Sequence, residues 1–257
     1  MTHTAASVKQ LLTNKSVNDI VKSNKVYSLF SILNKSNYKT SWIGNSTIVK
    51  SYAPIIRSNQ HVELIDKFRS IMSFNKALDE EMLQPFDSVL KTSKNQFITL
   101  HMTGSHWYYE NRYSAEFRKF TPVTDSKYIP SLGPQEIINS YDNTLVYLDN
   151  FIDTVIASVE KTHTKSIVMY VSDHGEILGE DGRWLHAQES EVSKNPAMIT
   201  WYSDELLAAY PESVKALKEN QHKRVTTDFF YHSVIDLYKI ENFNYNKNQS
   251  IFRKGNF

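Results

Sequence analysis

An apolar run in the second half of the chain ends abruptly in residues that could hold a metal ion. The run covers Ser166–Ser172 and is followed by Asp173, His174, Gly175 and Glu176. Aspartate oxygen and histidine nitrogen are common zinc ligands, and glycine lets the backbone turn tightly beside an ion. In open α/β sheets, ligands bind beyond the carboxyl ends of strands, where these residues would lie. The alternative is that Asp173 caps a helix and His174 is an ordinary surface residue.

Two further histidines could join this site. His106 follows a second strand-like segment, Gln96–Met102, so two strands of one sheet would aim imidazoles at the same edge. His186 comes 12 residues after His174, across a glycine-containing loop that is long enough to fold back over the site. The alternative is that the histidines are separate and exposed to solvent.

The first residues, Thr2–Val8, have the pattern of a helix start, with threonine hydroxyls at the positive end of the helix dipole. Taken alone, this pattern indicates a helix cap. Beside a divalent metal, a hydroxyl in that position would become acidic and nucleophilic, and the exposed amides would favour a bound phosphate. Thr4 therefore becomes a candidate only if a metal site lies next to it.

The segments that must position these residues alternate between strand and helix character. This alternation predicts an α/β layered fold with a mainly parallel sheet. We expect one domain covering residues 1–257. Pro134 begins the clearest helix, whose apolar residues recur at three- and four-residue spacing. A loop is expected over Thr121–Gly133. The expected strands are Tyr38–Ile43, Gln96–Met102, Ser166–Ser172 and Ala197–Tyr202, and two further helices are expected at Leu78–Leu90 and Thr226–Tyr238.

Composition excludes several classes of function. With 29 Lys+Arg against 28 Asp+Glu, the net charge is +1, so no overall field favours nucleic acid. The chain has no cysteine, so disulfides and thiolate metal sites are impossible and any metal must be held by nitrogen or oxygen ligands. The sequence contains neither an apolar run of 18 residues nor the pattern of a signal peptide.

Several segments together resemble, in order and approximate spacing, the catalytic domain of the phosphoethanolamine transferases, which belong to the alkaline phosphatase and sulfatase superfamily. Ser-Asp-His-Gly-Glu alone marks only the superfamily, and its combination with the other segments is more specific. These segments are Thr2–Val8, Trp42–Asn45, His101–His106 with Arg112 and Tyr113, Tyr141–Leu145, Ser172–Glu176 with His186, and Pro196–Trp201.

The resemblance implies an alkaline-phosphatase-like fold and specific roles for the candidate residues. Thr4 resembles the nucleophile and contributes, with Asp173 and His174, to a zinc site. His106 and His186 resemble the pair that binds the substrate phosphate or a second zinc, and either could protonate the leaving oxygen. Asn45 is a weaker candidate for binding the phosphate or the ethanolamine.

The implied reaction takes phosphoethanolamine from phosphatidylethanolamine onto Thr4 and then to lipid A or the lipopolysaccharide core. The implied location is the periplasmic side of the inner membrane. Members of the family carry an apolar strand, ending in a zinc-binding glutamate, just before the nucleophile helix, and an N-terminal bundle of membrane helices. Only three residues precede Thr4 here, so this chain is expected to lack that strand, one metal ligand and the membrane domain.

Two other functions remain open. A phosphodiesterase or other hydrolase of the superfamily would pass the intermediate to water. A sulfatase is disfavoured because the chain has no Cys/Ser-X-Pro-X-Arg segment from which formylglycine is made. A degenerate binding domain, motivated by the expected missing strand, would have no physical need for the retained set of Thr4, His106, Asp173, His174 and His186.

Overall fold

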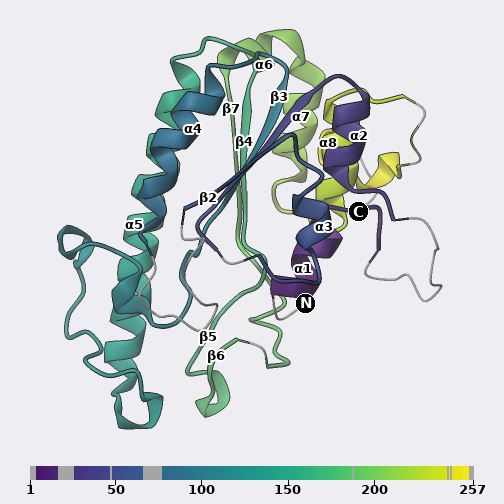
Figure 1. Ribbon diagram of the computed structural model, residues 1–257. Coiled ribbons are helices and arrows are strands. Elements are labelled where there is room, and N and C mark those ends of the chain that lie inside the picture. Colours follow the sequence, from purple (N-terminus) through teal and green to yellow (C-terminus); the bar gives the residue numbers. More distant parts are fainter. Residues whose placement is uncertain are drawn as a thin grey trace.

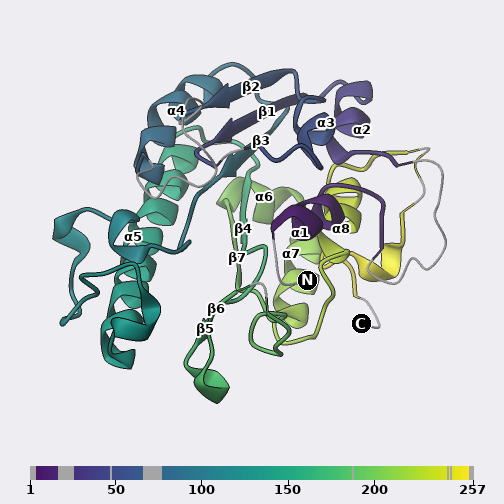
Figure 2. The same ribbon diagram turned by 60° about the horizontal axis from the view of Figure 1, so that its bottom comes forward.

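The computed structural model describes residues 4–16, 26–46, 48–65, 77–186, 188–241, 243 and 245–254. Its strands lie between two groups of helices (Figures 1 and 2). One group contains α4 (Leu83–Leu90) and α5 (Pro134–Glu160), and the other contains α1 (Thr4–Leu11), α2 (Leu29–Lys35) and α8 (Phe229–Leu237). The remaining helices are α3 (Ala53–Ile56), α6 (Asp204–Ala209) and α7 (Pro211–Asn220).

The strands of the described residues form three separate sheets. A parallel sheet has the order β2-β1-β3, with β1 at Lys39–Gly44, β2 at His61–Leu64 and β3 at Gln96–His101. The second pairs β4 (Ile167–Val171) with β7 (Met198–Tyr202) in antiparallel orientation. The third is a small hairpin of β5 (Ile177–Leu178) and β6 (Trp184–Leu185). All four expected strands are therefore present, but the last of them, β7, runs antiparallel to its neighbour.

β1 is buried on both faces, although only Trp42 and Ile43 among its residues are large and apolar. Five of its six residues are buried. Trp42 packs into the cluster formed with α1, α2 and α8, whereas its neighbour Ile43 packs into the cluster formed with α4 and α5. Because successive side chains of a strand point to opposite faces, β1 connects the two halves of the core.

The long helix begins at Pro134, as the sequence predicts. Gly133 precedes it, and the Gly133 N–H donates to Glu136 Oε2 at 2.8 Å, which satisfies one amide at the start of the helix. Ile137, Phe151 and Val155 lie on its buried face. Among the helices of the described residues, none combines the length and the apolar character needed to cross a membrane.

The other helix predictions are confirmed with shorter bounds. The expected Leu78–Leu90 helix is a 3₁₀ turn at Asp79–Met82 followed by α4, and the expected Thr226–Tyr238 helix is α8. The expected loop 121–133 is irregular apart from one 3₁₀ turn at Ile129–Ser131. Short 3₁₀ turns also occur at Tyr109–Asn111, Ala115–Phe117, Glu180–Gly182 and Lys247–Gln249.

Candidate active site

The loops that follow β3 and β4 bring three histidines together. The ring centroids of His106 and His186 are 5.1 Å apart, and those of His174 and His186 are 4.5 Å apart in a stacked arrangement. His106 follows β3 and His174 follows β4, so the carboxyl ends of both strands lead into one site. The predicted convergence of these three residues is therefore found: the histidines are not separate, although His106 is exposed to solvent.

Each of the three imidazoles is anchored through the same nitrogen. His106 Nδ1 lies 2.6 Å from the carbonyl oxygen of Trp107, and His174 Nδ1 lies 3.0 Å from that of Gly175. His186 Nδ1 lies 3.0 Å from Glu176 Oε2. These oxygens can only accept a hydrogen bond, so each Nδ1 carries a proton. Each Nε2 is then left to bind a metal ion, or to donate to a phosphoryl oxygen when the ring is protonated.

Asp173 and His174 offer two ligand atoms side by side. Asp173 Oδ1 lies 3.6 Å from His174 Nε2, and the two side chains are 28% and 11% exposed. Position 175 requires glycine because the backbone of Val192 passes too close to leave room for a side chain. A Cβ at this position would lie 2.2 Å from the carbonyl oxygen of Val192.

Glu176 is a site residue for which the sequence interpretation proposed no role, although the Ser-Asp-His-Gly-Glu segment contains it. Its Oε1 accepts a hydrogen bond of 2.5 Å from the hydroxyl of the fully buried Tyr109, and its Oε2 accepts the bond from His186. Ligand atoms of His174, Glu176 and His186 lie within 4.8 Å of one another.

His186 and His106 have opposite electrostatic environments. The hydrogen bond to Glu176 raises the pKa of His186 above its usual value, against the effect of burial. Burial lowers the pKa of His106, and the neighbouring His186 lowers it further. His186 is therefore favoured as a proton donor and His106 as a neutral imidazole, which is the division of roles that acid–base chemistry requires.

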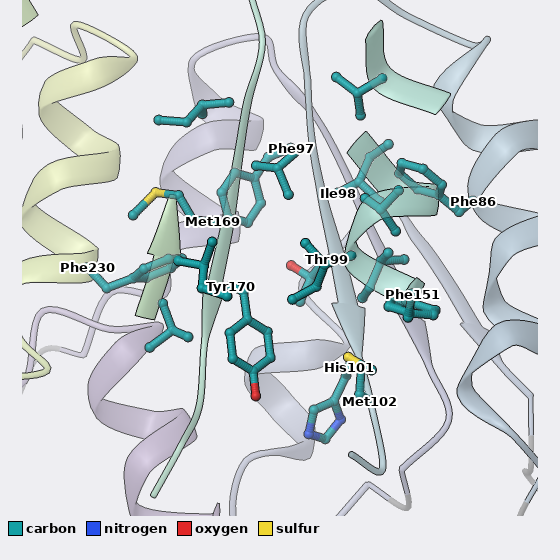
Figure 3. A pocket seen from close by; sticks show the side chains of 18 of the residues that line it. Phe86, Phe97, Ile98, Thr99, His101, Met102, Phe151, Met169, Tyr170 and Phe230 are labelled. Atoms are coloured by element: carbon teal, nitrogen blue, oxygen red, sulfur yellow. The ribbon is translucent and has the colours of Figure 1, made fainter. Parts of the chain in front are cut away.

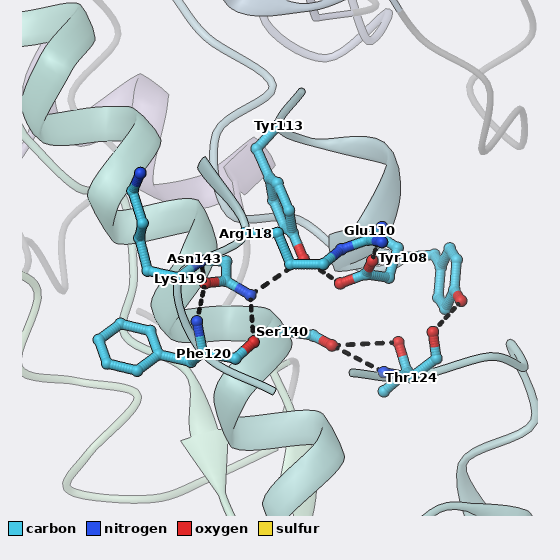
Figure 4. A network of polar contacts seen from close by, with 9 residues as sticks. All are labelled: Tyr108, Glu110, Tyr113, Arg118, Lys119, Phe120, Thr124, Ser140 and Asn143. Carbon is cyan, nitrogen blue, oxygen red and sulfur yellow. Dashed lines mark hydrogen bonds and ion pairs between the residues drawn. The ribbon is translucent and has the colours of Figure 1, made fainter. Parts of the chain in front are cut away.

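A polar network fastens the segment after His106 to the long helix (Figure 4). Asn143 on α5 accepts hydrogen bonds from the backbone N–H groups of Lys119 and Phe120 at 2.8 and 2.9 Å. Ser140, also on α5, accepts from the N–H of Thr124 at 2.9 Å. Closer to the site, Arg112 Nε donates to the carbonyl oxygen of His106 at 2.8 Å. These contacts hold the loop that carries His106 against a rigid element.

Thr4 is the first residue of α1, and the preceding Thr2 and His3 lie outside the described residues. Thr4 lines the same cavity, of about 2030 Å³, as His106, Asp173, His174 and His186. The structure thus places the predicted nucleophile on the cavity that holds the histidines. Its catalytic role stays a prediction.

Asn45 has a structural environment. It is only 1% exposed, and its Nδ2 donates to the carbonyl oxygen of Ala77 at 2.7 Å and to Asp79 Oδ1 at 2.8 Å. Asp79 in turn accepts hydrogen bonds from the N–H groups of Thr103 and Gly104. These contacts support the loop after β3. Substrate binding by Asn45 stays a prediction that none of its described contacts supports.

Nitrogen and carboxylate donors in this arrangement fit a zinc ion. Zinc binds histidine nitrogen and carboxylate oxygen, and a histidine ligand usually donates its other ring N–H to a carbonyl or carboxylate. His174 meets this description through Gly175, and His186 meets it through Glu176. Hard cations such as magnesium prefer sites made of oxygen alone.

Comparison with known proteins places this arrangement in a family. Residues 1–240 match the Sulfatase family. The chain is 36% identical over 152 residues to the phosphoethanolamine transferase EptA of Escherichia coli K12, a match that covers 56% of this chain and 28% of that protein. The matched region therefore spans less than a third of the length of this relative.

Solved structures agree with the sequence comparison. The C-terminal periplasmic domain of phosphoethanolamine transferase EptC from Campylobacter jejuni matches 99% of this chain and 80% of its own, with a TM-score of 0.85 and 25% identity. The soluble domain of lipooligosaccharide phosphoethanolamine transferase A from Neisseria meningitidis matches 96% of this chain and 77% of its own, with a TM-score of 0.82 and 28% identity.

A third structure, the periplasmic domain of EptC from E. coli in complex with Zn, shares the fold with a TM-score of 0.82 and 21% identity, over 98% of this chain and 73% of its own. The expected alkaline-phosphatase-like fold and the resemblance to phosphoethanolamine transferase domains are both confirmed. The converging histidines, the Ser-Asp-His-Gly-Glu turn and the match over most of its length show that this chain belongs to the Sulfatase family.

Proposed function

We propose that this chain is the catalytic domain of a zinc-dependent phosphoethanolamine transferase. The observation that carries the proposal is the convergence of Asp173 and three Nδ1-anchored histidines on the cavity that Thr4 also lines. The similarity to domains of phosphoethanolamine transferases supports the type of group transferred.

Thr4, Asp173 and His174 are proposed to hold the zinc ion. The fit of the donor atoms supports this set, because His174 Nε2 and Asp173 Oδ1 are 3.6 Å apart and the opposite nitrogen of His174 is fixed by a backbone carbonyl. A bound zinc ion would lower the pKa of the threonine hydroxyl and neutralise charge on phosphoryl oxygens.

Thr4 then serves as the nucleophile. Its hydroxyl proton passes to solvent, and its Oγ attacks the phosphorus of phosphatidylethanolamine and forms a phosphothreonine-type ester while the bond to the diacylglycerol oxygen breaks. His186, whose pKa is raised by Glu176, donates a proton to that leaving oxygen. The pair His106 and His186 is proposed to bind the substrate phosphate, through the Nε2–H of a protonated ring, or a second zinc ion, through an unprotonated Nε2.

The second half of the reaction regenerates Thr4. An oxygen of the acceptor gives its proton to His186, which lost one in the first half, and attacks the same phosphorus. The threonine oxygen leaves and takes up a proton from solvent. Lipid A or the lipopolysaccharide core is the proposed acceptor, in keeping with the lipooligosaccharide transferase among the structural neighbours. The periplasmic domains among those neighbours support a periplasmic site of action at the inner membrane.

Intact-mass spectrometry and peptide mapping test this proposal. The zinc-loaded chain is incubated with phosphatidylethanolamine, and a phosphoethanolamine adduct is expected on Thr4. Thr4→Ala should give no adduct and Thr4→Ser should retain one, because serine keeps the hydroxyl. An adduct on another residue would remove Thr4 from the mechanism. Release of ethanolamine phosphate to water with no acceptor modified would identify a hydrolase instead.

A further inference from the structure

A short hairpin carries both members of the His186–Glu176 pair. Its strands β5 and β6 pair Ile177 with Leu185. Glu176 comes immediately before β5 and His186 immediately after β6, so both residues leave the hairpin at the same end. Figures 1 and 2 show this hairpin at one end of the molecule. The conformation of the Ile177–Leu185 pair therefore controls how the imidazole meets the carboxylate.

Leu185, the last residue of β6, has a left-handed backbone with a φ of 69°. In this conformation the Cβ of an L-residue lies too close to the following carbonyl oxygen, so the conformation is routine only for glycine and, less often, for asparagine and aspartate. The other non-glycine residues of positive φ in the described chain are polar and exposed, namely Asn37, His163, Asp181 and Lys239. Leu185 differs from them because it is apolar and half-buried.

The strands that lead to the other two histidines have regular backbones. The cavity between β3 and β4 is lined by side chains of both strands, among them Thr99, His101 and Tyr170 (Figure 3). The structure describes every residue of these two strands, and none of them has a positive φ. His106 and His174 thus follow unstrained strands, whereas His186 follows a strained residue.

The side chain of Leu185 has apolar contacts that offset this strain. It packs against the Trp107 cluster, which consists of the buried residues Trp107, Tyr108, Tyr109 and Ile137. On the other strand of the hairpin, its partner Ile177 is fully buried. The direction of the Cα–Cβ bond relative to the chain changes with φ, so an extended backbone at this position would move the leucine side chain away from the cluster.

The same cluster supports the carboxylate that His186 contacts. Tyr109, a member of the cluster, donates to Glu176 Oε1, and Glu176 Oε2 accepts from His186 Nδ1. The imidazole is therefore fixed from two directions. Its Nδ1 is held through Glu176 and Tyr109, and its backbone is held through Leu185.

We propose that Leu185 is a positioning residue, whose strained backbone, held by packing against the Trp107 cluster, aims the ring of His186 at Glu176. This inference rests on the transferase function proposed above, in which His186 protonates the leaving oxygen. Strained residues persist only where their surroundings over-determine them, and they cluster at active sites. Glycine would adopt the same φ without strain, but it would adopt other conformations as readily and leave the imidazole free to turn away.

Exchange of the His186 Nδ1 proton with water tests this role by NMR of the isotope-labelled full chain. A proton bonded to a buried carboxylate exchanges slowly, and its signal is assigned by its loss in His186→Gln. Leu185→Ala should exchange this proton at least about tenfold faster, because alanine has the same backbone strain without the packing that offsets it, and the bond to Glu176 opens. Leu185→Met keeps the apolar volume and should retain slow exchange.

Leu178→Ala is the matched control, because Leu178 is a half-buried leucine of the same hairpin without a positive φ. It should leave the exchange rate almost unchanged. Equal acceleration in the two alanine variants would reduce Leu185 to a general part of the hairpin and overturn the proposal. Slow exchange retained in Leu185→Ala or in Leu185→Gly would also overturn it, because the leucine side chain would then not be needed.

Adduct formation on Thr4 supplies a second readout. Its rate should fall about 10- to 100-fold in Leu185→Ala and recover in Leu185→Met, as expected for a residue that orients an active-site histidine. An unchanged rate in Leu185→Ala would overturn the role of Leu185 in the reaction. If the unaltered chain forms no adduct, the proposed function fails, whereas the exchange rates still decide whether Leu185 positions His186.

Discussion

His186 and Glu176 are joined by a hydrogen bond within the site, with 3.0 Å between His186 Nδ1 and Glu176 Oε2. Tyr109 holds the other carboxylate oxygen at 2.5 Å, so the glutamate is fixed between a buried phenol and an imidazole. This chain of contacts orients the histidine ring and keeps its proton on Nδ1.

Replacing Glu176 by glutamine should lower the rate of adduct formation about 10- to 100-fold, the usual effect of losing a group that orients an active-site histidine. The change removes the negative charge that raises the pKa of His186, so that pKa should fall. NMR titration of the histidine in the zinc-free chain measures this change. Tyr109→Phe keeps the carboxylate and should have the smaller effect. A pKa of His186 that does not change in Glu176→Gln would contradict the role of this pair.

Zinc content should depend on Asp173. Asp173→Asn removes one of few charged ligands and should weaken zinc binding more than about 100-fold. Losing a residue that only orients a ligand usually weakens metal binding by about 10- to 100-fold, so the larger loss would identify a ligand. Asp181→Asn is the matched control, because Asp181 has an 82% exposed side chain and a positive φ that asparagine tolerates. Competition with a chelator measures both affinities. Equal affinities in the two variants would remove Asp173 from the metal site.

His101 should make the stability of the protein sensitive to acid. Burial lowers its pKa to about 4, with an opposing effect from Asp173. Below its ordinary pKa of 6.5 the imidazole takes up a proton in the unfolded chain but not in the folded one, so protonation favours unfolding. The free energy of unfolding is therefore highest above pH 6.5 and falls as the pH decreases towards 4. At pH 5 the loss should reach about 2 kcal/mol relative to neutral pH.

Urea unfolding at pH 7.5 and pH 5 checks this prediction. His101→Phe should reduce the difference between the two free energies of unfolding, because phenylalanine keeps a ring against Trp42 and has no titrating group. His163→Asn is the control, because the His163 side chain is 85% exposed and its φ of 48° suits asparagine. A difference that is the same in both variants would contradict a specific effect of His101.

Gly175 should not tolerate a side chain. The Cβ of Gly175→Ala would meet the carbonyl oxygen of Val192 at 2.2 Å, so the backbone has to shift at a cost of about 1–3 kcal/mol. We expect a fall of several degrees in Tm, measured by calorimetry, and weaker zinc binding because the turn carries His174. Gly133→Ser should leave Tm almost unchanged, since no atom lies closer than 3.4 Å to the added Cβ. A Tm unchanged in Gly175→Ala would show that the turn can adapt.

Much of the architecture could be predicted because its signals are local. The strands at β1, β3, β4 and β7 follow short apolar segments, and α5 starts at Pro134 and follows a repeat of three to four residues. The small elements β2, β5, β6 and α3, and the helices α2, α6 and α7, were not predicted. They have short or polar sequences, and contacts with the rest of the fold select their conformation.

The sequence by itself determined the identity of the reactive groups and their order along the chain. Thr4, His106, Asp173, His174 and His186 could all be named from residue type and from their places after strands or at a helix start. Only the tertiary structure decided which nitrogen of each histidine forms a hydrogen bond with the protein. It also decided that Glu176, itself bonded to Tyr109, accepts from His186, and that Asn45 donates to Asp79. The order of strands and the cavity between β3 and β4 also belong to the tertiary structure. Local preferences act within a few residues of the chain, whereas these relationships join residues far apart in sequence whose distances are set by packing.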